Sequence, residues 1–444
     1  MMTKSGVFVR VLSVAAAAAP VFTVFIANNA AEAGGFAIRE QSAKHQGMSF
    51  AGDAVCGDSI AGTFWNSAVV TCAHGLVVEG SLSGIIPITE VTTNPFPGSL
   101  FGAGSPIANF GDPGKIGEAA IVPATTVAYG IDEHWSVGVT VNAPYGLSTD
   151  TRFNNAAQIY GRKSEVVSIN ANPVVGFRFN EVFALAAGVQ VQYFDVKLTQ
   201  AVSPLPRTPS AELKGDDIGF GFTAGILITP SPDTEIGIGF RSSIEHSVDG
   251  NLFLPGFPAL PVSTDPKLPD MISASFRQRI TPAFTLYGTA EWSNWSEFGT
   301  FDVINKGTGT VATTLPFEYD DGWFFSLGGE YEFTNGWTAR AGIGWEISPV
   351  SDQVRSVRLP DDDRLWLSVG ASYDITESMT FNAGYSFLST FGTTIDYSPG
   401  NPHYVAPVTF SGDVDAQVHI VSLGLSYKWS GPEPVVTQPM VYKQ

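Results

Sequence analysis

Residues 251–262 are the strongest candidate for a binding surface, because this whole stretch carries no charge. It reads NLFLPGFPALPV, and its large apolar side chains are Leu252, Phe253, Leu254, Phe257 and Leu260. Exposed apolar patches of this kind usually mark binding sites. We expect the segment to capture apolar small molecules, and the alternative is that it only packs against neighbouring loops. Side chains of an earlier loop would complete the groove: Phe96, Leu100, Phe101 and Phe110.

Basic residues decide whether such a site could also hold an apolar molecule that carries a carboxylate. Inside a cavity of low dielectric constant, that carboxylate needs a Lys or Arg partner. The candidate partners are Lys197, Arg241, Arg355, Arg358 and Arg364. The competing interpretation, which the sequence favours, is that these residues form loop ion pairs with Asp352 and residues 361–363.

No arrangement of residues points to catalysis. The chain has six histidines, and none lies in a recognisable nucleophile motif. There is no G-x-S-x-G elbow and no phosphate-binding loop. Asp361, Asp362 and Asp363 could bind a divalent cation, but consecutive acidic residues more often form a solvated loop. We therefore expect no enzyme activity, no cofactor and no metal site.

The chain contains two cysteines, Cys56 and Cys72. In an exported protein a pair sixteen positions apart is expected to form a disulfide, and the alternative is two free thiols. Their spacing does not fit a zinc site, and no histidine pair would complete one.

The elements that must position these residues are β-strands. Between Val69 and Trp429, segments of about ten residues alternate apolar and polar side chains, and the breaks between them are short and long in turn. The polar face is mostly Gly and Ser, whereas a soluble sandwich would place more Lys and Glu there. The pattern predicts an all-β fold, a 14-stranded antiparallel transmembrane β-barrel.

The predicted strands begin near Val69, Ile121, His134, Glu165, Val182, Asp217, Thr234, Leu268, Phe284, Tyr319, Gly336, Arg364, Ser378 and Gln417. Short breaks such as Asp132-Glu133 and Asn180-Glu181 contain turn-forming residues. Bacterial barrels have short periplasmic turns and long outer loops. Both ends of this barrel are therefore expected on the periplasmic side.

Composition agrees with a membrane barrel and excludes other classes. Only 15% of the residues are charged, against about 25% in soluble domains. The formal net charge of −19 argues against nucleic acid, which needs clustered Lys and Arg. After the N-terminal region no apolar run is long enough for a helical membrane span.

The two ends of the chain differ from the alternating region. Residues 1–33 are expected to be a signal peptide, with Lys4 and Arg10 before an apolar stretch and Ala31-Glu32-Ala33 as the cleavage site. Cleavage would make Gly34 the first residue, and the alternative is an uncleaved membrane anchor. Residues 430–444 contain three prolines and are expected to be a disordered periplasmic tail.

Residues 34–68 do not alternate and are rich in Gly, Ala and Ser. Such a segment ahead of a barrel is either a periplasmic tail or a plug. A lumen as wide as that of a 14-stranded barrel needs filling if it is not to be an open pore.

Several motifs resemble the FadL/TodX family of outer-membrane transporters for hydrophobic compounds. GGFAIREQSAKHQGMSFAGDA, from Gly34, and TFWNSA, at residues 63–68, resemble the family's N-terminal hatch. APYGLST (residues 143–149), NPVVGFRFN (residues 172–180) and WSNWSEF (residues 292–298) match in order and spacing. SPVSDQVRSVRLPDDDRLWLSVGASY (residues 348–373) is the longest match, and together the motifs cover most of the mature chain.

The resemblance implies a barrel over residues 69–429 that is closed by a hatch at residues 34–68. It places Gly34, Phe36, Asn66, Ser67 and Ala68 in the hatch, although Ser67 stands where the family has Pro. Members capture fatty acids or aromatic hydrocarbons between outer loops and pass them to an inner site. Hatch movement with a kink in the third strand then opens a lateral exit.

Gly138 and Pro144 are the candidates for that lateral opening, because Pro lacks the ladder donor and Gly weakens a strand; the alternative is an ordinary strand end. Fatty-acid transporters of the family place basic residues on the lumen side of strands five and ten. Asp195 and Asp321 align near those places, which favours a neutral hydrocarbon here.

We therefore expect a passive transporter of hydrophobic small molecules in the outer membrane of a Gram-negative bacterium. The alternatives are a general diffusion porin and, with less support, a lipid hydrolase. Expected partners are the hydrophobic ligand, outer-membrane lipid and lipopolysaccharide, and the barrel assembly machinery. We expect a monomer that binds no nucleic acid.

Overall fold

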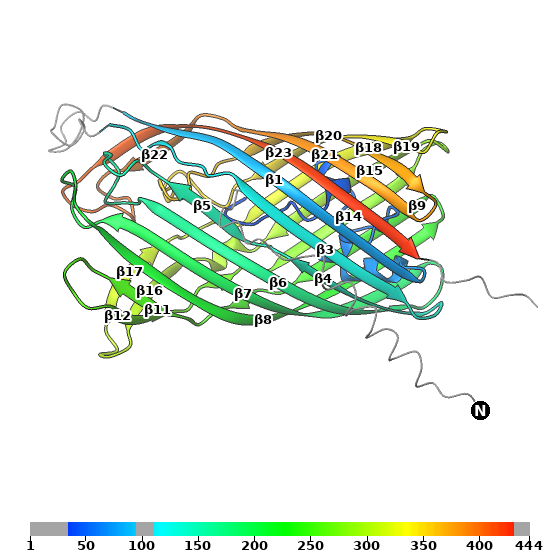
Figure 1. Ribbon diagram of the computed structural model, residues 1–444, viewed down its shortest axis with the longest axis horizontal. Coiled ribbons are helices and arrows are strands. Elements are labelled where there is room, and N and C mark those ends of the chain that lie inside the picture. Colours follow the sequence, from blue (N-terminus) through cyan, green and yellow to red (C-terminus); the bar gives the residue numbers. More distant parts are fainter. Residues whose placement is uncertain (1–33, 95–110, 430–444) are drawn as a thin grey trace, which may run out of the picture.

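The computed structural model describes residues 34–94 and 111–429. Within these ranges, fourteen strands form the barrel wall (Figure 1). They are β1 (Leu76–Thr93), β3 (Ala120–Gly130), β4 (Trp135–Asn142), β6 (Lys163–Arg178), β7 (Phe183–Ala201), β8 (Ser210–Ser231), β9 (Thr234–Arg241), β14 (Met271–Arg279), β15 (Phe284–Ser293), β18 (Gly322–Glu332), β19 (Trp337–Ile347), β20 (Arg364–Thr376), β21 (Met379–Thr390) and β23 (Phe410–Trp429). The predicted fold class is confirmed.

The barrel is closed by its first and last strands. β1 pairs antiparallel with β23, from Leu76 opposite Trp429 to Thr93 opposite Gly412, and its other edge pairs with β3. Side chains that alternate outward are large and apolar, as in Leu423 of β23 and Phe220 of β8, which is 67% exposed. Lipid is the environment that accepts such a surface, and closure leaves no sheet edge within it.

The long connections gather at one end of the barrel, on the left in Figure 1. The hairpin of β11 (Val248–Phe253) and β12 (Leu260–Thr264) extends the wall, because β11 pairs with the outer half of β8. A second hairpin, β16 (Thr300–Asn305) and β17 (Val311–Pro316), pairs with β12. The remaining short elements at this end are β2 (Gly114–Lys115), β5 (Gly146–Asp150), β10 (Ile244–Glu245), β13 (Lys267–Leu268), η4 (Trp295–Glu297) and β22 (Thr393–Tyr397).

Three predicted strand starts are wrong by seven residues. β1 begins at Leu76 rather than near Val69, because residues 67–72 form a 3₁₀ helix inside the barrel. β8 begins at Ser210 rather than Asp217, and β23 at Phe410 rather than Gln417. The outer ends of these two strands carry charges such as Lys214 and Asp413, so alternation is lost where the backbone still pairs.

The non-alternating N-terminal segment is a plug, and it extends to residue 75 rather than 68. It contains α2 (Ala43–Gln46) and the 3₁₀ helices η1 (Ala61–Phe64) and η2 (Ser67–Cys72). Figure 1 shows it in blue within the wall. Its large side chains, among them Met48, Phe50 and Trp65, are almost completely buried. We call residues 34–75 the hatch.

Glycines on the lumen face of the wall allow the hatch backbone to lie directly against it. A Cβ at Gly239 of β9 would lie 1.9 Å from the carbonyl oxygen of Trp65. A Cβ at Gly237 would lie equally close, 1.9 Å, to the carbonyl oxygen of Ala54. Side chains at these positions would push the hatch away from the strands, so the small residues of this face serve contact with the hatch.

Three expectations fall outside the described residues: the signal peptide (1–33), the tail (430–444) and Phe101 with its neighbours in the first outer loop. In the part of the chain that is described, no helix is long and apolar enough to cross a membrane.

Candidate functional site: an inner cavity between the hatch and the barrel wall

The third strand of the wall is interrupted around Pro144. β4 ends at Asn142, and the wall resumes with β5 at Gly146. On one side both pieces pair with β6. On the other side β3 pairs with β4 only from Thr125 onward, so residues 120–124 of β3 pair with β1 alone. The wall is therefore weakened at this place.

The hatch inserts a short strand into the interruption. Ile38 N donates to Pro144 O at 2.8 Å, and Gly146 N donates to Phe36 O at 2.9 Å. Ala37 and Tyr145 lie directly opposite each other as an antiparallel bridge. Backbone groups that the kink leaves without a wall partner are thus satisfied by the hatch.

The two candidates for the lateral opening differ in position. Pro144 lies within the interruption. Gly138 lies inside β4, paired on both sides with Ala128 and Val174. A Cβ at Gly138 would lie 2.8 Å from the side chain of Val70 in the hatch. Gly138 therefore permits close packing of η2 and does not interrupt the wall.

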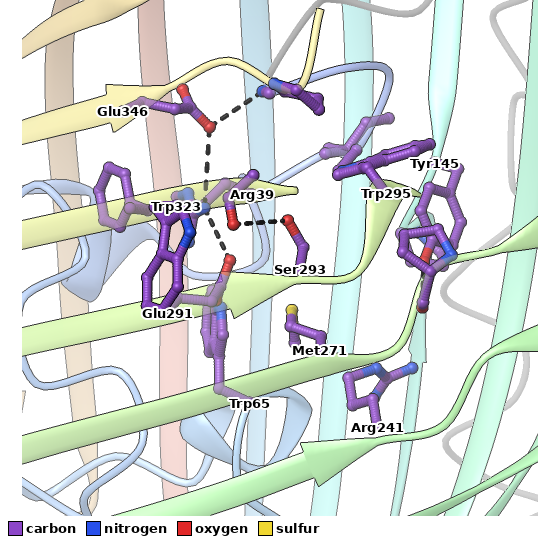
Figure 2. A pocket seen from close by; sticks show the side chains of 18 of the residues that line it. Arg39, Trp65, Tyr145, Arg241, Met271, Glu291, Ser293, Trp295, Trp323 and Glu346 are labelled. Carbon is purple, nitrogen blue, oxygen red and sulfur yellow. Dashed lines mark hydrogen bonds and ion pairs between the residues drawn. The ribbon is translucent and has the colours of Figure 1, made fainter. Parts of the chain in front are cut away.

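A cavity lies next to the interruption (Figure 2). Its walls are mostly aromatic and apolar, with a few charged groups. The residues that decide its chemistry come from the hatch (Gly34, Ala37, Ile38, Arg39, Phe64, Trp65), from the kink (Pro144, Tyr145) and from the wall and loops (Gln190, Arg241, Met271, Glu291, Trp295, Trp323, Phe324, Glu346). A concave apolar site with few polar groups is the usual form of a small-molecule binding site.

Arg39 of the hatch lies between two carboxylates of the wall (Figure 2). Its Nη2 is 2.8 Å from Glu291 Oε1 and 3.8 Å from Glu346 Oε1. Its guanidinium also lies 3.8 Å from the ring centre of Phe324. Burial works against its charge, but Glu291 and Glu346 outweigh that effect and raise the pKa of Arg39. The sequence interpretation missed these residues, although charges on transmembrane segments are themselves a functional signal.

Arg241 is the cavity's cation without a carboxylate partner among the described residues. Its guanidinium donates to Phe64 O at 3.0 Å and to Gln190 Oε1, and lies 4.3 Å from the ring centre of Phe64. The side chain is only 5% exposed. A buried guanidinium held only by neutral acceptors is suited to bind an incoming carboxylate.

Three other basic candidates are paired with acids, and two of them, Arg355 and Arg364, with acids that the competing interpretation named. Arg355 pairs with Asp352 and Asp362, and Lys197 lies 3.4 Å from Glu212. Arg364 pairs with Asp361 and, at 3.5 Å, with Glu346. Arg358 instead donates to Ser164, Gln200 and two backbone carbonyls.

The expected solvated acidic loop at residues 361–363 is wrong for Asp361. This carboxylate is buried and accepts from Gly35 N at 2.8 Å and from Ser348 Oγ at 2.6 Å. Burial raises its pKa, with Arg364 opposing the shift. Among the described residues no group of side chains could hold a metal ion.

Asp195 and Asp321, which favoured a neutral ligand, are not among the residues that line the cavity. Asp195 shares its face of β7 with the exposed Val191 and Tyr193, so it faces away from the lumen. Asp321 accepts from Trp292 Nε1 at 2.9 Å. The sequence argument against a carboxylate ligand therefore loses its basis.

The apolar residues proposed for ligand capture lie at the outer end, apart from the inner cavity. They form the tip of the β11–β12 hairpin, where Leu252 lies opposite Leu260. Phe253, Leu254 and Phe257 are exposed, and Phe257 reaches 72%. Side chains packed against neighbouring loops would not be this exposed.

Asn66, Ser67 and Ala68 fasten the hatch to the wall. The Asn66 side chain accepts from Ala68 N at 3.0 Å, which caps η2, and donates to Ile226 O at 2.9 Å. Ser67 Oγ donates to Thr223 Oγ1 at 2.7 Å. Ser at this position therefore keeps the turn and adds a wall contact that Pro could not make.

Buried titratable groups make the stability of the hatch depend on pH. Burial raises the pKa of Glu40 to about 7 and, together with Glu291, that of Asp53 to about 8, with Arg39 opposing both shifts. Burial lowers the pKa of His45 to about 3. In the unfolded chain these two carboxyl groups titrate near pH 4. Their contribution to folding stability is therefore lost as the pH rises from about 4 through the raised pKa values of Glu40 and Asp53. Alkaline pH therefore works against a seated hatch.

Cys56 and Cys72 are joined in a disulfide, with their Cα atoms 6.2 Å apart. The bond encloses η1 and most of η2, the part of the hatch that packs on β6, β7 and β8. Reduction is expected to loosen this part because it frees a loop that the bond closes.

We predict that unreduced protein, unfolded in detergent and heat, takes up no maleimide label. After reduction, mass spectrometry should find two labels on the wild-type protein. It should find none on a Cys56→Ser, Cys72→Ser double variant. Two labels on unreduced wild-type protein would show that the thiols are free.

Comparison with known proteins agrees with this geometry. A family model described as "Outer membrane protein transport protein (OMPP1/FadL/TodX)" matches residues 24–429. The chain belongs to this family. As a FadL/TodX protein it is an outer-membrane β-barrel of a Gram-negative bacterium that transports hydrophobic compounds and is not an enzyme.

Relatives of this FadL/TodX protein carry two kinds of name. It is 26% identical over 410 residues to a long-chain fatty acid transport protein of Escherichia coli O6:H1. The alignment covers 82% of this chain and 89% of the relative. The crystal structure of a Pseudomonas aeruginosa FadL homologue has a TM-score of 0.78 at 20% identity, over 90% of this chain and 100% of that one. The Pseudomonas putida toluene transporter TodX has a TM-score of 0.64 at 14% identity, over 88% and 99% of the two chains. The two structures support the fold.

Proposed function

We propose that the protein takes up a long-chain amphiphile with a carboxylate, such as a fatty acid, by a passive three-step route. The ligand is captured at the tip of the β11–β12 hairpin. It then diffuses to the inner cavity, where Arg241 binds its carboxylate. Movement of residues 34–39 finally opens the kink around Pro144 and releases the ligand sideways into the membrane.

The observation that carries the proposal is the composition of the cavity wall. Ala37, Ile38, Pro144 and Tyr145 all line the cavity, and they also form the bridge that fills the interruption. A ligand in the cavity therefore touches the backbone segment whose withdrawal would unpair the wall. Binding and release share one structural element, which is what ligand-controlled release requires.

Arg241 favours a carboxylate over a neutral hydrocarbon. A neutral ligand would leave this buried guanidinium with only Phe64 O and Gln190 as acceptors. Relatives named long-chain fatty acid transport proteins point the same way. The experiment is to extract ligands from the purified barrel and identify them by mass spectrometry. Recovery of aromatic hydrocarbons without acids would remove the carboxylate from the proposal.

Capture at the hairpin predicts an uptake defect without a folding defect. Phe253→Asp combined with Phe257→Asp places two charges on an exposed apolar tip, which should slow oleate uptake several-fold. Both side chains are exposed, so the barrel should keep its heat-modifiable mobility on gels. Phe333→Asp, at an exposed position near the opposite end of β18, is the control for a charge placed outside the capture site. Unchanged uptake by the double variant would remove the hairpin from the route.

A general porin is the second candidate function, and the buried hatch counts against it. An open aqueous pore needs a polar passage, whereas Phe50, Trp65 and Val69 fill the lumen with almost fully buried apolar side chains. Steady ion conductance of wild-type protein in planar bilayers would favour the porin. Outer-membrane lipid, lipopolysaccharide and the barrel assembly machinery remain proposed partners of a monomeric barrel.

A further inference from the structure

The backbone nitrogen of Gly34 lies in an acidic pocket at the edge of the cavity. Gly34 N is 2.9 Å from Glu346 Oε1, a buried contact between residues 312 positions apart in sequence. The next nitrogen, that of Gly35, donates to Asp361 Oδ2 at 2.8 Å. Two consecutive nitrogens at the start of the described chain thus meet two buried carboxylates.

The pocket has space for these two residues only as glycines. A Cβ at Gly34 would lie 2.7 Å from Glu346 Oε1. Gly35 has a φ of +66°, and a Cβ there would lie 3.0 Å from the ring of Trp295. A side chain at either position would move the nitrogen off its carboxylate, so the sequence and the pocket fit each other.

The pocket is part of a buried network of ion pairs. Glu291, Glu346 and Asp361 are linked through Arg39 and Arg364, which gives three acids for two bases. All five side chains are less than a tenth exposed. Buried carboxylates are stable only when paired, so a cation beside Glu346 would stabilise this network.

We propose that a third cation of this network is the α-ammonium group of Gly34, created by removal of residues 1–33. A signal peptidase would hydrolyse the Ala33–Gly34 peptide bond with one water, leaving a carboxylate on Ala33 and an amine on Gly34. That amine takes up a proton at neutral pH, because α-amino groups titrate near pH 8. The ammonium then pairs with Glu346.

This assignment makes processing part of the construction of the binding site. An amide nitrogen at Gly34 donates one neutral hydrogen bond, whereas an ammonium forms charge-assisted bonds of about twice the strength. The new N-terminus fixes residues 34–39 across the cavity, between Glu346 on β19 and the kink at Pro144. The charge-assisted contact with Glu346 therefore belongs only to the cleaved chain.

Amine labelling of the barrel purified from outer membranes tests the assignment. Intact mass should show a chain that begins at Gly34. Acylation near pH 7 favours the α-amine over lysine ammonium groups. The Gly34 amine should therefore label at least 10-fold more slowly in the folded barrel than after heat unfolding. A mass that includes residues 1–33, or equal labelling in both states, would overturn the proposal.

Two variants test whether slow labelling of the Gly34 amine is caused by the ion pair with Glu346 or by burial alone. Glu346→Gln should raise labelling of Gly34 in the folded barrel at least 10-fold. Glu332→Gln, on the neighbouring strand and exposed, should label like wild type. If Glu346→Gln does not fold, one Ser inserted between Ala33 and Gly34 moves the amine out of the pocket and should label quickly. Slow labelling of both would contradict the ion pair.

Uptake measured on the same proteins keeps this proposal separate from the transport route. Rapid labelling of Gly34 in a wild-type barrel that takes up oleate would overturn the ion pair alone. Slow labelling in a barrel that takes up no fatty acid would count against the proposed function and support the seated N-terminus.

Discussion

Replacing Arg241 by Gln is expected to weaken binding of a long-chain fatty acid by about 10- to 100-fold. Hydrogen bonds to charged groups contribute about 1.5–3 kcal/mol, and each 1.4 kcal/mol is a factor of ten. Gln can still donate to Phe64 O but cannot carry the positive charge. The effect should therefore follow the carboxylate and not the size of the side chain. Calorimetry or fluorescence titration of the detergent-solubilised barrel measures it.

The choice of ligands and variants isolates the charge. Arg279→Gln removes a positive charge at the exposed end of β14 and should leave the affinity unchanged. The methyl ester of the same fatty acid should bind wild type and Arg241→Gln equally. Arg241→Lys should retain part of the affinity, because Lys keeps the charge but loses the planar fork. Equal fatty-acid affinity of wild type and Arg241→Gln would show that the carboxylate binds elsewhere.

Locking the hatch to the kink is expected to reduce uptake at least 10-fold. Ala37 and Tyr145 form an antiparallel pair flanked by two hydrogen bonds from the neighbouring residues. Such non-hydrogen-bonded pairs have Cα atoms about 4.5 Å apart, within the range of a disulfide. Ala37→Cys with Tyr145→Cys should therefore cross-link under mild oxidation. If the bridge must part for ligand to leave, the oxidised barrel cannot release it.

Reduction of the same sample provides the comparison. Uptake by the double variant should recover after reductant, even though the Tyr145 ring stays absent. Wild type treated in parallel shows what reduction of the Cys56–Cys72 bond does by itself. Full uptake by a barrel that mass spectrometry finds completely cross-linked at 37 and 145 would exclude movement of this bridge from the mechanism.

A period of two along the chain was sufficient to predict the wall. The alternation that ends at Trp429 specifies which side chains face lipid, and the alternation of short and long breaks specifies which end faces the periplasm. Both signals are local, so they survive without knowledge of any partner strand. They failed at the charged outer ends of β8 and β23, where pairing continues without alternation, and at η2, which packs on β6, β7 and β8 inside the barrel.

The binding site could not be predicted from a local sequence pattern. Arg39, Arg241, Glu291 and Glu346 come from the hatch and three strands, and no sequence pattern relates one to another. The sequence grouped the cations with the aspartates of residues 361–363 by proximity along the chain. The structure confirms this pairing for Asp361 and Arg364, brings the start of the hatch to the same carboxylate, and leaves Arg241 facing the cavity.

The sequence by itself determined a closed, lipid-facing wall of fourteen strands and the family. Only the tertiary structure decided what the lumen face is for. Inward-facing glycines are compatible both with a water-filled lumen and with a hatch backbone in direct contact with the wall. Which of the two applies depends on which hatch atom lies opposite each glycine in the closed barrel. The contact of Gly34 with Glu346, 312 positions away, exists only because β23 pairs with β1 and encloses the hatch.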